Sequence, residues 1–248
     1  MRAEFVQRQL PEIADDRDRR QALLHFGVGP KGDPGVKWRM PDPTTPPLPR
    51  RALLALAIPL IGCAVAQPAG VTPRQITGPF YPTDWSGDAD ADLVRVTGEA
   101  AQAQGVVTHL RGRLRDADGA TLAGARIEIW QCDAHGIYRH PRDREAARDM
   151  GFQGRGRLLT GADGGFAFRT IRPVPYPGRP PHIHLLVAAP GRPELITQLY
   201  LDGEPANARD PLFSRLNAAG REALTLRPVP AERLEAAAWL AERDLTLG

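Results

Sequence analysis

The sequence predicts an all-β protein, an antiparallel β-sandwich with long loops and little helix. From about residue 106 onward, apolar and polar residues alternate in short runs, as they do in strands with one buried face. Turn-forming pairs, among them Asp118-Gly119 and Asp163-Gly164, separate these runs. The chain is also rich in residues that end regular elements, with 25 glycines and 25 prolines among its 248 residues. Short strands punctuated in this way are typical of sandwiches.

Five strands are expected in chain order, at residues 110–116, 125–131, 165–171, 182–188 and 195–201. The first two are predicted to pair as a hairpin, because the Asp118-Gly119 turn lies between them. Nearer the C-terminus, residues 231–243 favour a helix by propensity, whereas residues 239–247 equally suit a last strand. Both interpretations of this segment stay open.

Composition and charge exclude several classes of protein. Hydrophobic residues make up 42% and charged residues 25% of the chain, which excludes wholesale disorder, collagen and a multi-span membrane protein. The formal net charge of +3 arises entirely before residue 52, where both lysines, Lys31 and Lys37, also lie. The rest of the chain is neutral, so we expect no clustered cationic surface for nucleic acid.

The N-terminal region is interpreted as an export signal over residues 40–66. Arg50-Arg51 precede an apolar run at 52–61 that is too short to span a bilayer, and small residues follow it. Two processing routes stay open: cleavage after Ala66, or lipidation of Cys63 as a membrane anchor. A buried core helix is the alternative to a signal. The protein is therefore expected to be exported, to the periplasm or the cell exterior.

The remaining boundaries follow from this signal. Residues 1–39 are either a disordered extension or lie upstream of a translation start at Met40. Residues 67–105 are expected to form an N-terminal arm, and residues 106–248 the sandwich domain. Cys132 is then the only cysteine of the mature domain, so packing rather than a disulfide stabilises it.

A pair of histidines is the first candidate for chemistry. His182 and His184 stand at alternate positions of a predicted strand, so both imidazoles point to the same face and can hold a metal ion together. For an isolated pair, two hydrogen-bonded histidines in a half-buried strand are an equally good interpretation. The next carboxylate, Glu194, follows a turn and makes a poor third ligand.

Tyrosines complete the candidate site. The chain has four of them: Tyr81, Tyr138, Tyr176 and Tyr200. Tyr176 stands between prolines just before the histidine pair, and Tyr138 lies on the loop that leaves the strand at 125–131. Two phenolates with two imidazoles suit Fe(III) better than Zn(II) or Cu(I). A bound ferric ion would lower the pKa of both phenols enough to keep them ionised near neutral pH.

Seven short motifs follow one another along the chain: residues 76–82, Trp130-Gln131 with 138–140, 156–160, 168–171, 175–177, 179–184 and 196–200. They occur in the order found in the intradiol ring-cleavage dioxygenases. Over about residues 75–203 the chain resembles this family, most closely the iron-bearing β subunits of protocatechuate 3,4-dioxygenases. The short spacing between Tyr176 and His182 departs from those subunits, so the rim of the pocket and the substrate are expected to differ.

The resemblance implies a non-haem iron enzyme. Fe(III) would be held by four residues: Tyr138, Tyr176, His182 and His184. The enzyme would cleave a catechol-type ring with O2 between its two hydroxyl-bearing carbons, giving a cis,cis-muconate-type product. By motif position, Tyr176 is the ligand that substrate displaces and the base that accepts a catechol proton. Arg179 would stabilise negative charge on the ring, and Gln198 would line the pocket.

Two other functions remain as alternatives. Residues 112–130 also resemble transthyretin-like accessory domains, which favours an exported, non-catalytic binding module. The histidine pair alone would also suit a zinc or copper hydrolase or oxidase. We expect His135 and His140 to be solvent-facing loop residues, Trp130 to be a core residue and Cys132 to have no chemical role. Partners other than a catecholic substrate and O2 stay open, including a homo- or hetero-oligomer.

Overall fold

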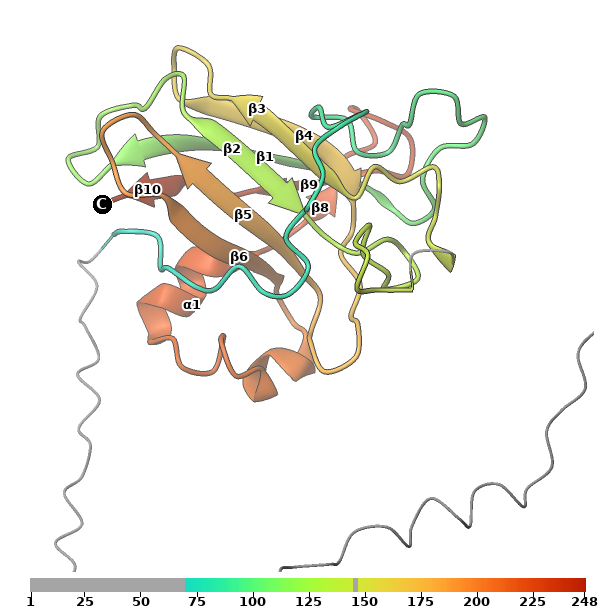
Figure 1. Cartoon of the computed structure of the whole chain (residues 1–248). Helices are drawn as coiled ribbons and strands as arrows, with labels where there is room; N and C mark the ends of the chain where they lie inside the picture. The colour runs from blue at the N-terminus through green and yellow to red at the C-terminus, as the bar shows by residue number, and fades with distance from the viewer. Residues whose placement is uncertain (1–69, 145–146) are drawn as a thin grey trace, which may run out of the picture. The chain divides into compact units, whose positions relative to one another are not determined.

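Two five-stranded sheets form the framework of the protein (Figure 1). This computed structural model describes residues 70–144 and 147–248. The predicted export signal at 40–66, the lipidation candidate Cys63 and residues 1–39 lie outside the described residues. The described part of the predicted arm, residues 70–105, contains no helix and no strand of either sheet.

The first sheet is built around a long central strand. Its members are β1 (Val107–Asp116), β4 (Gly165–Ile171), β8 (Val229–Pro230), β9 (Trp239–Glu242) and β10 (Leu245–Leu247). β4 pairs antiparallel with one edge of β1, with Leu110 opposite Phe168. β9 and then β10 pair with the other edge, both parallel to β1. β8 pairs antiparallel with β9 and closes the sheet.

The second sheet carries the histidine pair. Its strands, in spatial order, are β3 (Arg155–Leu159), β2 (Arg126–Trp130), β5 (His182–Ala188), β6 (Leu195–Leu201) and β7 (Thr225–Leu226). The first four pair antiparallel, and β7 is parallel to β6. β5 is therefore a central strand, covered by neighbours on both edges.

The apolar core lies between the two sheets, where alternate side chains interdigitate. It includes Leu110, Leu114, Ile127, Ile129, Phe166, Phe168, Ile183, Leu185 and Val187, all of which are buried. The opposite face of β2 and β5 is also buried, because residues of the arm cover it. Gln75 N–H donates to the Ile196 carbonyl at 2.7 Å, and the Tyr81 hydroxyl donates to Glu128 at 2.7 Å. The second sheet thus has a covered outer face on which a site can be enclosed.

Helix is scarce, as expected. The described residues contain one α-helix, α1 (Ala218–Leu224), and a short 3₁₀ helix, η3 (Pro205–Arg209). Asn217 caps α1, since its side chain accepts from the Gly220 N–H at 2.7 Å. Over the part of the chain that the structure describes, no helix has the length and apolar character needed to cross a membrane.

The all-β sandwich is confirmed, and three strands have the predicted bounds: β4, β5 and β6. The sheets are nevertheless mixed rather than purely antiparallel, because β7, β9 and β10 pair in parallel. The helix interpretation of 231–243 is wrong. Trp239–Glu242 is strand β9, since pairing with β1 and β8 outweighs the local preference for helix.

The predicted hairpin between the first two strands is also wrong. After the Asp118-Gly119 turn, the chain pairs with β1 only over a few residues, where the Leu122 N–H donates to the Leu114 carbonyl at 3.0 Å. The Ala125 N–H then donates to the Thr160 hydroxyl at 3.0 Å. This contact directs β2 into the second sheet, across the core from β1.

Candidate metal centre

Strand β5 points His182 and His184 to the covered outer face of the second sheet. The residue between them, Ile183, and the next, Leu185, point into the core. Both histidines are 1% exposed, and their Nε2 atoms lie 3.1 Å apart. The period of the strand therefore brings two ring nitrogens to one point, as the sequence predicted.

The protonation of His182 follows from its surroundings. Its Nδ1 lies 2.7 Å from the Pro180 carbonyl oxygen, which only accepts, so Nδ1 carries the proton and Nε2 keeps its lone pair. Burial lowers the pKa of His182 to about 4 and the pKa of His184 well below its usual value. Both imidazoles are thus neutral near pH 7, which is the form that binds metals.

Tyr138 reaches this point from the loop that follows β2. Two carboxylates shape the loop: Asp133 accepts the Ile137 N–H at 3.0 Å, and Asp143 accepts the Tyr138 N–H at 2.8 Å. The ring of Phe80 stacks on Tyr138, with centroids 4.7 Å apart and planes 20° apart. The Tyr138 hydroxyl is buried without a hydrogen-bond partner among the described residues. Burial raises the pKa of this phenol well above its usual value.

Tyr176 approaches from the loop before β5. A tight turn, in which the Arg179 N–H donates to the Tyr176 carbonyl at 2.9 Å, sets its direction. The ring centroid of Tyr176 lies 5.3 Å from that of Tyr138 and 5.4 Å from that of His182. Tyr138 and His184 are 6.1 Å apart by the same measure. The structure therefore brings all four predicted ligands together.

This donor set fits a ferric ion. The Nε2 atoms of two neutral imidazoles converge beside a buried phenol that has no hydrogen-bond partner among the described residues, which is the arrangement a metal would satisfy. Within residues 70–144 and 147–248, no group of three or more His, Cys, Asp or Glu residues is arranged to hold a metal ion. The further donors beside the imidazoles are phenols, which favour a hard ion such as Fe(III).

Arg179 forms part of a cavity of about 290 Å³ next to Tyr176. Its Nε donates to Asp210 at 2.6 Å, and its Nη2 donates to the Gln198 side-chain oxygen at 2.6 Å. Gln198 in turn donates to the Ile76 carbonyl at 3.1 Å and is fully buried. The structure thus places Arg179 on the cavity wall and Gln198 behind it.

Comparison with known proteins identifies the family. A family model described as "Dioxygenase" matches residues 76–234. The protocatechuate 3,4-dioxygenase beta chain of Burkholderia cepacia is 34% identical over 163 residues, covering 62% of this chain and 69% of that one. The chain belongs to the intradiol ring-cleavage dioxygenases. The matched residues include the candidate site, because all four candidate ligands lie between residues 76 and 234.

Other members of this dioxygenase family differ in length from the chain. Hydroxyquinol 1,2-dioxygenase of Nocardioides simplex is 37% identical over 134 residues, but this covers 46% of the chain and only 43% of that enzyme. The dioxygenase domain of a carbohydrate-binding fusion protein from Streptomyces sp. SirexAA-E has a similar structure. Its TM-score is 0.56 at 34% identity, covering 71% of this chain and 97% of that domain.

Several residues around this candidate site were not predicted from the sequence. Asp210 is a lone aspartate after η3, and no local pattern marks it as a partner of Arg179. Phe80 lies in the motif at residues 76–82, but its contact with Tyr138 depends on the path of the arm. Trp130 is buried, as expected, yet it packs on the outer face of the sheet against His184 rather than in the sandwich core.

The two loop histidines have different environments. His135 is exposed, in agreement with its prediction. His140 is buried, so its predicted exposure is wrong. Its Nδ1 accepts the Arg142 N–H at 3.1 Å, and its ring packs edge-on against Phe80, because the loop folds back under the arm. Cys132 is buried too, and burial raises the pKa of its thiol to about 12.

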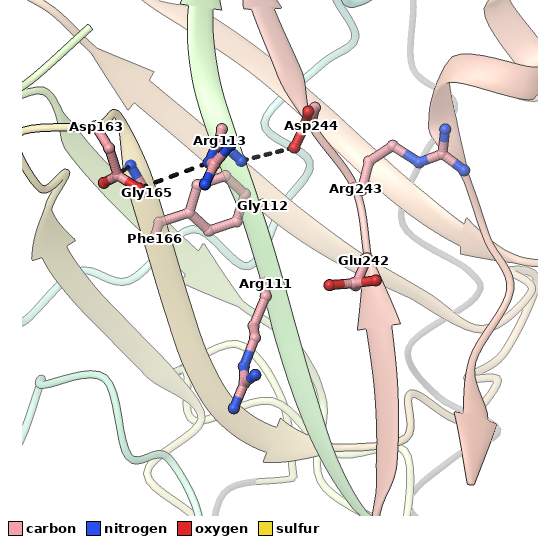
Figure 2. Close-up of a pocket in the computed structure, with 9 residues that line it drawn as sticks. All are labelled: Arg111, Gly112, Arg113, Asp163, Gly165, Phe166, Glu242, Arg243 and Asp244. Atoms are coloured by element: carbon pink, nitrogen blue, oxygen red, sulfur yellow. Dashed lines mark hydrogen bonds and ion pairs between the residues drawn. The ribbon is translucent and has the colours of Figure 1, made fainter. Parts of the chain in front are cut away.

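A larger hollow of about 650 Å³ lies on the first sheet, away from these ligands (Figure 2). Its charged side chains are Arg111, Arg113, Asp163, Glu242, Arg243 and Asp244, so cations and anions are equal in number. Arg113 contacts two of the acids. Its Nε lies 3.5 Å from the Asp163 carboxylate, and its backbone N–H donates to the Asp244 carboxylate at 2.8 Å. No histidine or tyrosine lines this hollow, so it offers no counterpart of the donor set on the second sheet.

Proposed function

We propose that this protein is an Fe(III)-dependent intradiol dioxygenase that cleaves a catechol-type ring with O2 to a cis,cis-muconate-type product. One observation carries the proposal: the Nε2 atoms of two neutral imidazoles converge with two phenols beside a cavity whose wall holds a guanidinium. When bound, ferric iron would supply a Lewis acid that draws electron density from the catechol oxygens. The chain supplies the ligands, the proton acceptor and the charge that faces the substrate.

The two tyrosines differ in a way that fits different roles. Tyr138 is 1% exposed and covered by Phe80, so it is suited to remain a ligand throughout the reaction. Tyr176 is partly exposed and lines the cavity, so it would be the ligand open to exchange with an incoming catechol. Its phenolate would then be positioned to accept a proton from a catechol hydroxyl.

Arg179 provides positive charge at the cavity wall. Its guanidinium is held on two sides, by Asp210 and by Gln198, so it is already oriented before substrate enters. A fixed guanidinium in a largely dry site stabilises negative charge on a substrate ring more effectively than a mobile one in water. We assign Arg179 this role.

The alternatives are less well supported. A transthyretin-like binding module needs no convergent set of imidazoles and phenols. A zinc or copper hydrolase built on His182 and His184 would take its further ligands most readily from His, Cys or carboxylates. In the described residues no such group of three or more is arranged to hold a metal, and the rings of Tyr138 and Tyr176 pack beside the pair.

Two measurements test the proposed function. Iron-reconstituted protein should show a visible charge-transfer band from tyrosinate to ferric iron, and a colourless, iron-free preparation would overturn the proposal. Oxygen consumption should then be followed with catechol, protocatechuate, hydroxyquinol and gallate. Cleavage of at least one of them to a ring-opened dicarboxylate is expected, and the rates would identify the substrate.

We also propose that the protein is exported, on the strength of residues 40–66. Fractionation of cells that express the full chain should place it outside the cytoplasm. Metabolic labelling with a fatty acid would distinguish the two processing routes, because only lipidation depends on Cys63. Loss of the label in Cys63→Ser would identify a lipoprotein, and retention of the whole chain in the cytoplasm would overturn export.

A further inference from the structure

The two histidines of the donor set are oriented by different means. At His182, the hydrogen bond from Nδ1 to the Pro180 carbonyl holds the ring and selects its tautomer. At His184, Nδ1 is buried and has no hydrogen-bond partner among the described residues. Metal-binding imidazoles usually have such a partner on their second nitrogen. The ring of His184 therefore needs another source of orientation.

The indole of Trp130 lies flat against the imidazole of His184. Their ring centroids are 4.8 Å apart and their planes differ by 8°. The two residues face each other directly in the ladder between β2 and β5, so the register of the sheet brings the rings together. Rotation of His184 about its Cβ–Cγ bond would drive the ring into the indole. The stack can thus fix the orientation of the His184 ring, as the hydrogen bond does for His182.

Tyr81 packs against the other member of this stack. Its ring meets Trp130 edge-on, with centroids 5.0 Å apart and planes at 87°. Its hydroxyl donates to Glu128 at 2.7 Å, and the Glu128 side chain is fully buried. Arg126 pairs with the same carboxylate, which compensates its charge. The hydroxyl of Tyr81 is therefore held by Glu128, and its ring packs against the Trp130 indole.

The backbone of the arm completes the enclosure of His184. A Cβ built on Gly78 would lie 3.2 Å from Cε1 of the imidazole, so the arm passes within contact distance of the ring edge. Gly78 also has a φ of +76°, which side chains other than glycine rarely adopt. Trp130 thus contacts the face of the imidazole, and the arm contacts its edge.

We propose that Trp130 and Tyr81 are positioning residues for His184, and that their ring stack replaces the hydrogen bond that this ligand lacks. The inference rests on the proposed function, because it takes His184 to be a metal ligand. It predicts that metal affinity depends on residues that donate nothing to the metal.

Metal titration of the metal-free protein tests this role without any turnover. Co(II) is added first, because its visible absorption reports ligand geometry, and ferric iron is added in a second series. Trp130→Leu should weaken binding of both ions by about 10- to 100-fold. Trp130→Phe keeps an aromatic face and should recover most of that loss. Tyr81→Phe keeps its ring but loses the bond to Glu128, and should weaken binding by less than Trp130→Leu.

Trp239→Leu is the matched control. This indole lies in β9 of the other sheet, with the Arg172 guanidinium 5.6 Å from its ring centroid, and its loss should leave metal affinity unchanged. Thermal unfolding of each metal-free variant checks that it is folded. If Trp130→Leu does not fold, Trp130→Phe and Tyr81→Phe carry the test through smaller losses of affinity and altered Co(II) spectra.

The outcomes separate the two proposals. Wild-type affinity and spectra in all folded variants at Trp130 and Tyr81 would overturn the positioning role while leaving the dioxygenase assignment intact. A wild-type protein that binds neither ion would count against the donor set itself and hence against the proposed function. An equal loss of affinity in Trp239→Leu would show a general effect of indole loss and would also overturn the positioning role.

Discussion

The carboxylate of Asp210 holds the guanidinium of Arg179, with Oδ2 2.6 Å from Nε and the aspartate side chain fully enclosed. The other carboxylate oxygen accepts the N–H groups of Leu212 and Phe213 at 2.9 and 2.8 Å. Asp210 therefore ties the segment after η3 to the wall of the cavity. The orientation of Arg179 depends on a residue 31 positions further along the chain.

Asp210→Asn should lower turnover while leaving iron content unchanged. The asparagine retains one oxygen for the two backbone N–H groups, but its amide NH₂ in place of Oδ2 cannot accept from Arg179. We expect kcat to fall about 10- to 100-fold, because a misplaced guanidinium no longer meets the charge on the substrate. Steady-state kinetics with iron quantification check this. The control is Asp202→Asn, which removes an exposed pair with Arg227, and wild-type kcat in Asp210→Asn would contradict the assigned role.

Tyr138→Phe should make the metal-free protein more stable and abolish stable iron binding. The native hydroxyl is buried and has no hydrogen-bond partner within the described part of the chain, so its removal relieves a desolvation cost of about 1–2 kcal/mol. Urea unfolding of both metal-free proteins and the visible spectrum after iron loading measure the two effects. Tyr200→Phe is the opposite case, because its hydroxyl donates to Gln75 at 2.9 Å and its loss should destabilise. Full iron content in Tyr138→Phe would show that this phenol is not a ligand.

Glu235 should contribute stability that depends on pH. Hydrogen bonds from Arg169 hold the pKa of this carboxyl below its unfolded value of 4.5. A lowered pKa favours the folded state above that value, and the contribution is lost as pH falls through the folded pKa. Glu235→Gln should therefore cost roughly 0.5–1 kcal/mol at pH 7, since the pair is partly exposed, and less at pH 3. Thermal unfolding of both proteins at these pH values checks it, and a difference that persists undiminished at acid pH would refute the ionic origin.

Gly112→Ala should prevent or severely weaken folding. Its Cβ would overlap the carbonyl oxygen of Arg243, which lies beside β1 between β9 and β10. The Arg243 backbone and the tip of the Phe166 ring would both overlap this Cβ and leave little room to relax, so we expect a loss above about 3 kcal/mol. Gly161→Ala is the control, because there the nearest atom is the flexible Asp163 side chain at 3.2 Å. Circular dichroism and yield of soluble protein would show the contrast, and equal behaviour of the two variants would contradict it.

The sequence predicts best where the signal is local. The strand period placed His182 and His184 on one face, and the alternating residues of β4, β5 and β6 marked their bounds. The family motifs added Tyr138 and Tyr176, which the structure brings to the same point. Each of these predictions rests on residues that are neighbours in the chain or on a motif with a known order.

Long-range packing explains what the sequence did not predict. Asp210 reaches Arg179 only because η3 returns the chain to the cavity. β3 (Arg155–Leu159) lacks apolar alternation and forms because β2 offers it an edge. The first two predicted strands share a turn signal but bury their apolar faces from opposite sheets, so no local pattern distinguishes them from a hairpin. Trp239–Glu242 is a strand for a similar reason, since its partner in β1 is more than a hundred residues away.

The parallel pairing of β9 and β10 with β1 has a consequence for biosynthesis. β1 is made early, but one of its edges stays open until residues 239–247 have been synthesised. An open edge is a template for pairing with other chains, and contacts between distant residues form slowly. The nascent first sheet is therefore exposed to aggregation through most of translation. Chaperone protection of β1 would then matter more for yield than the final stability of the fold.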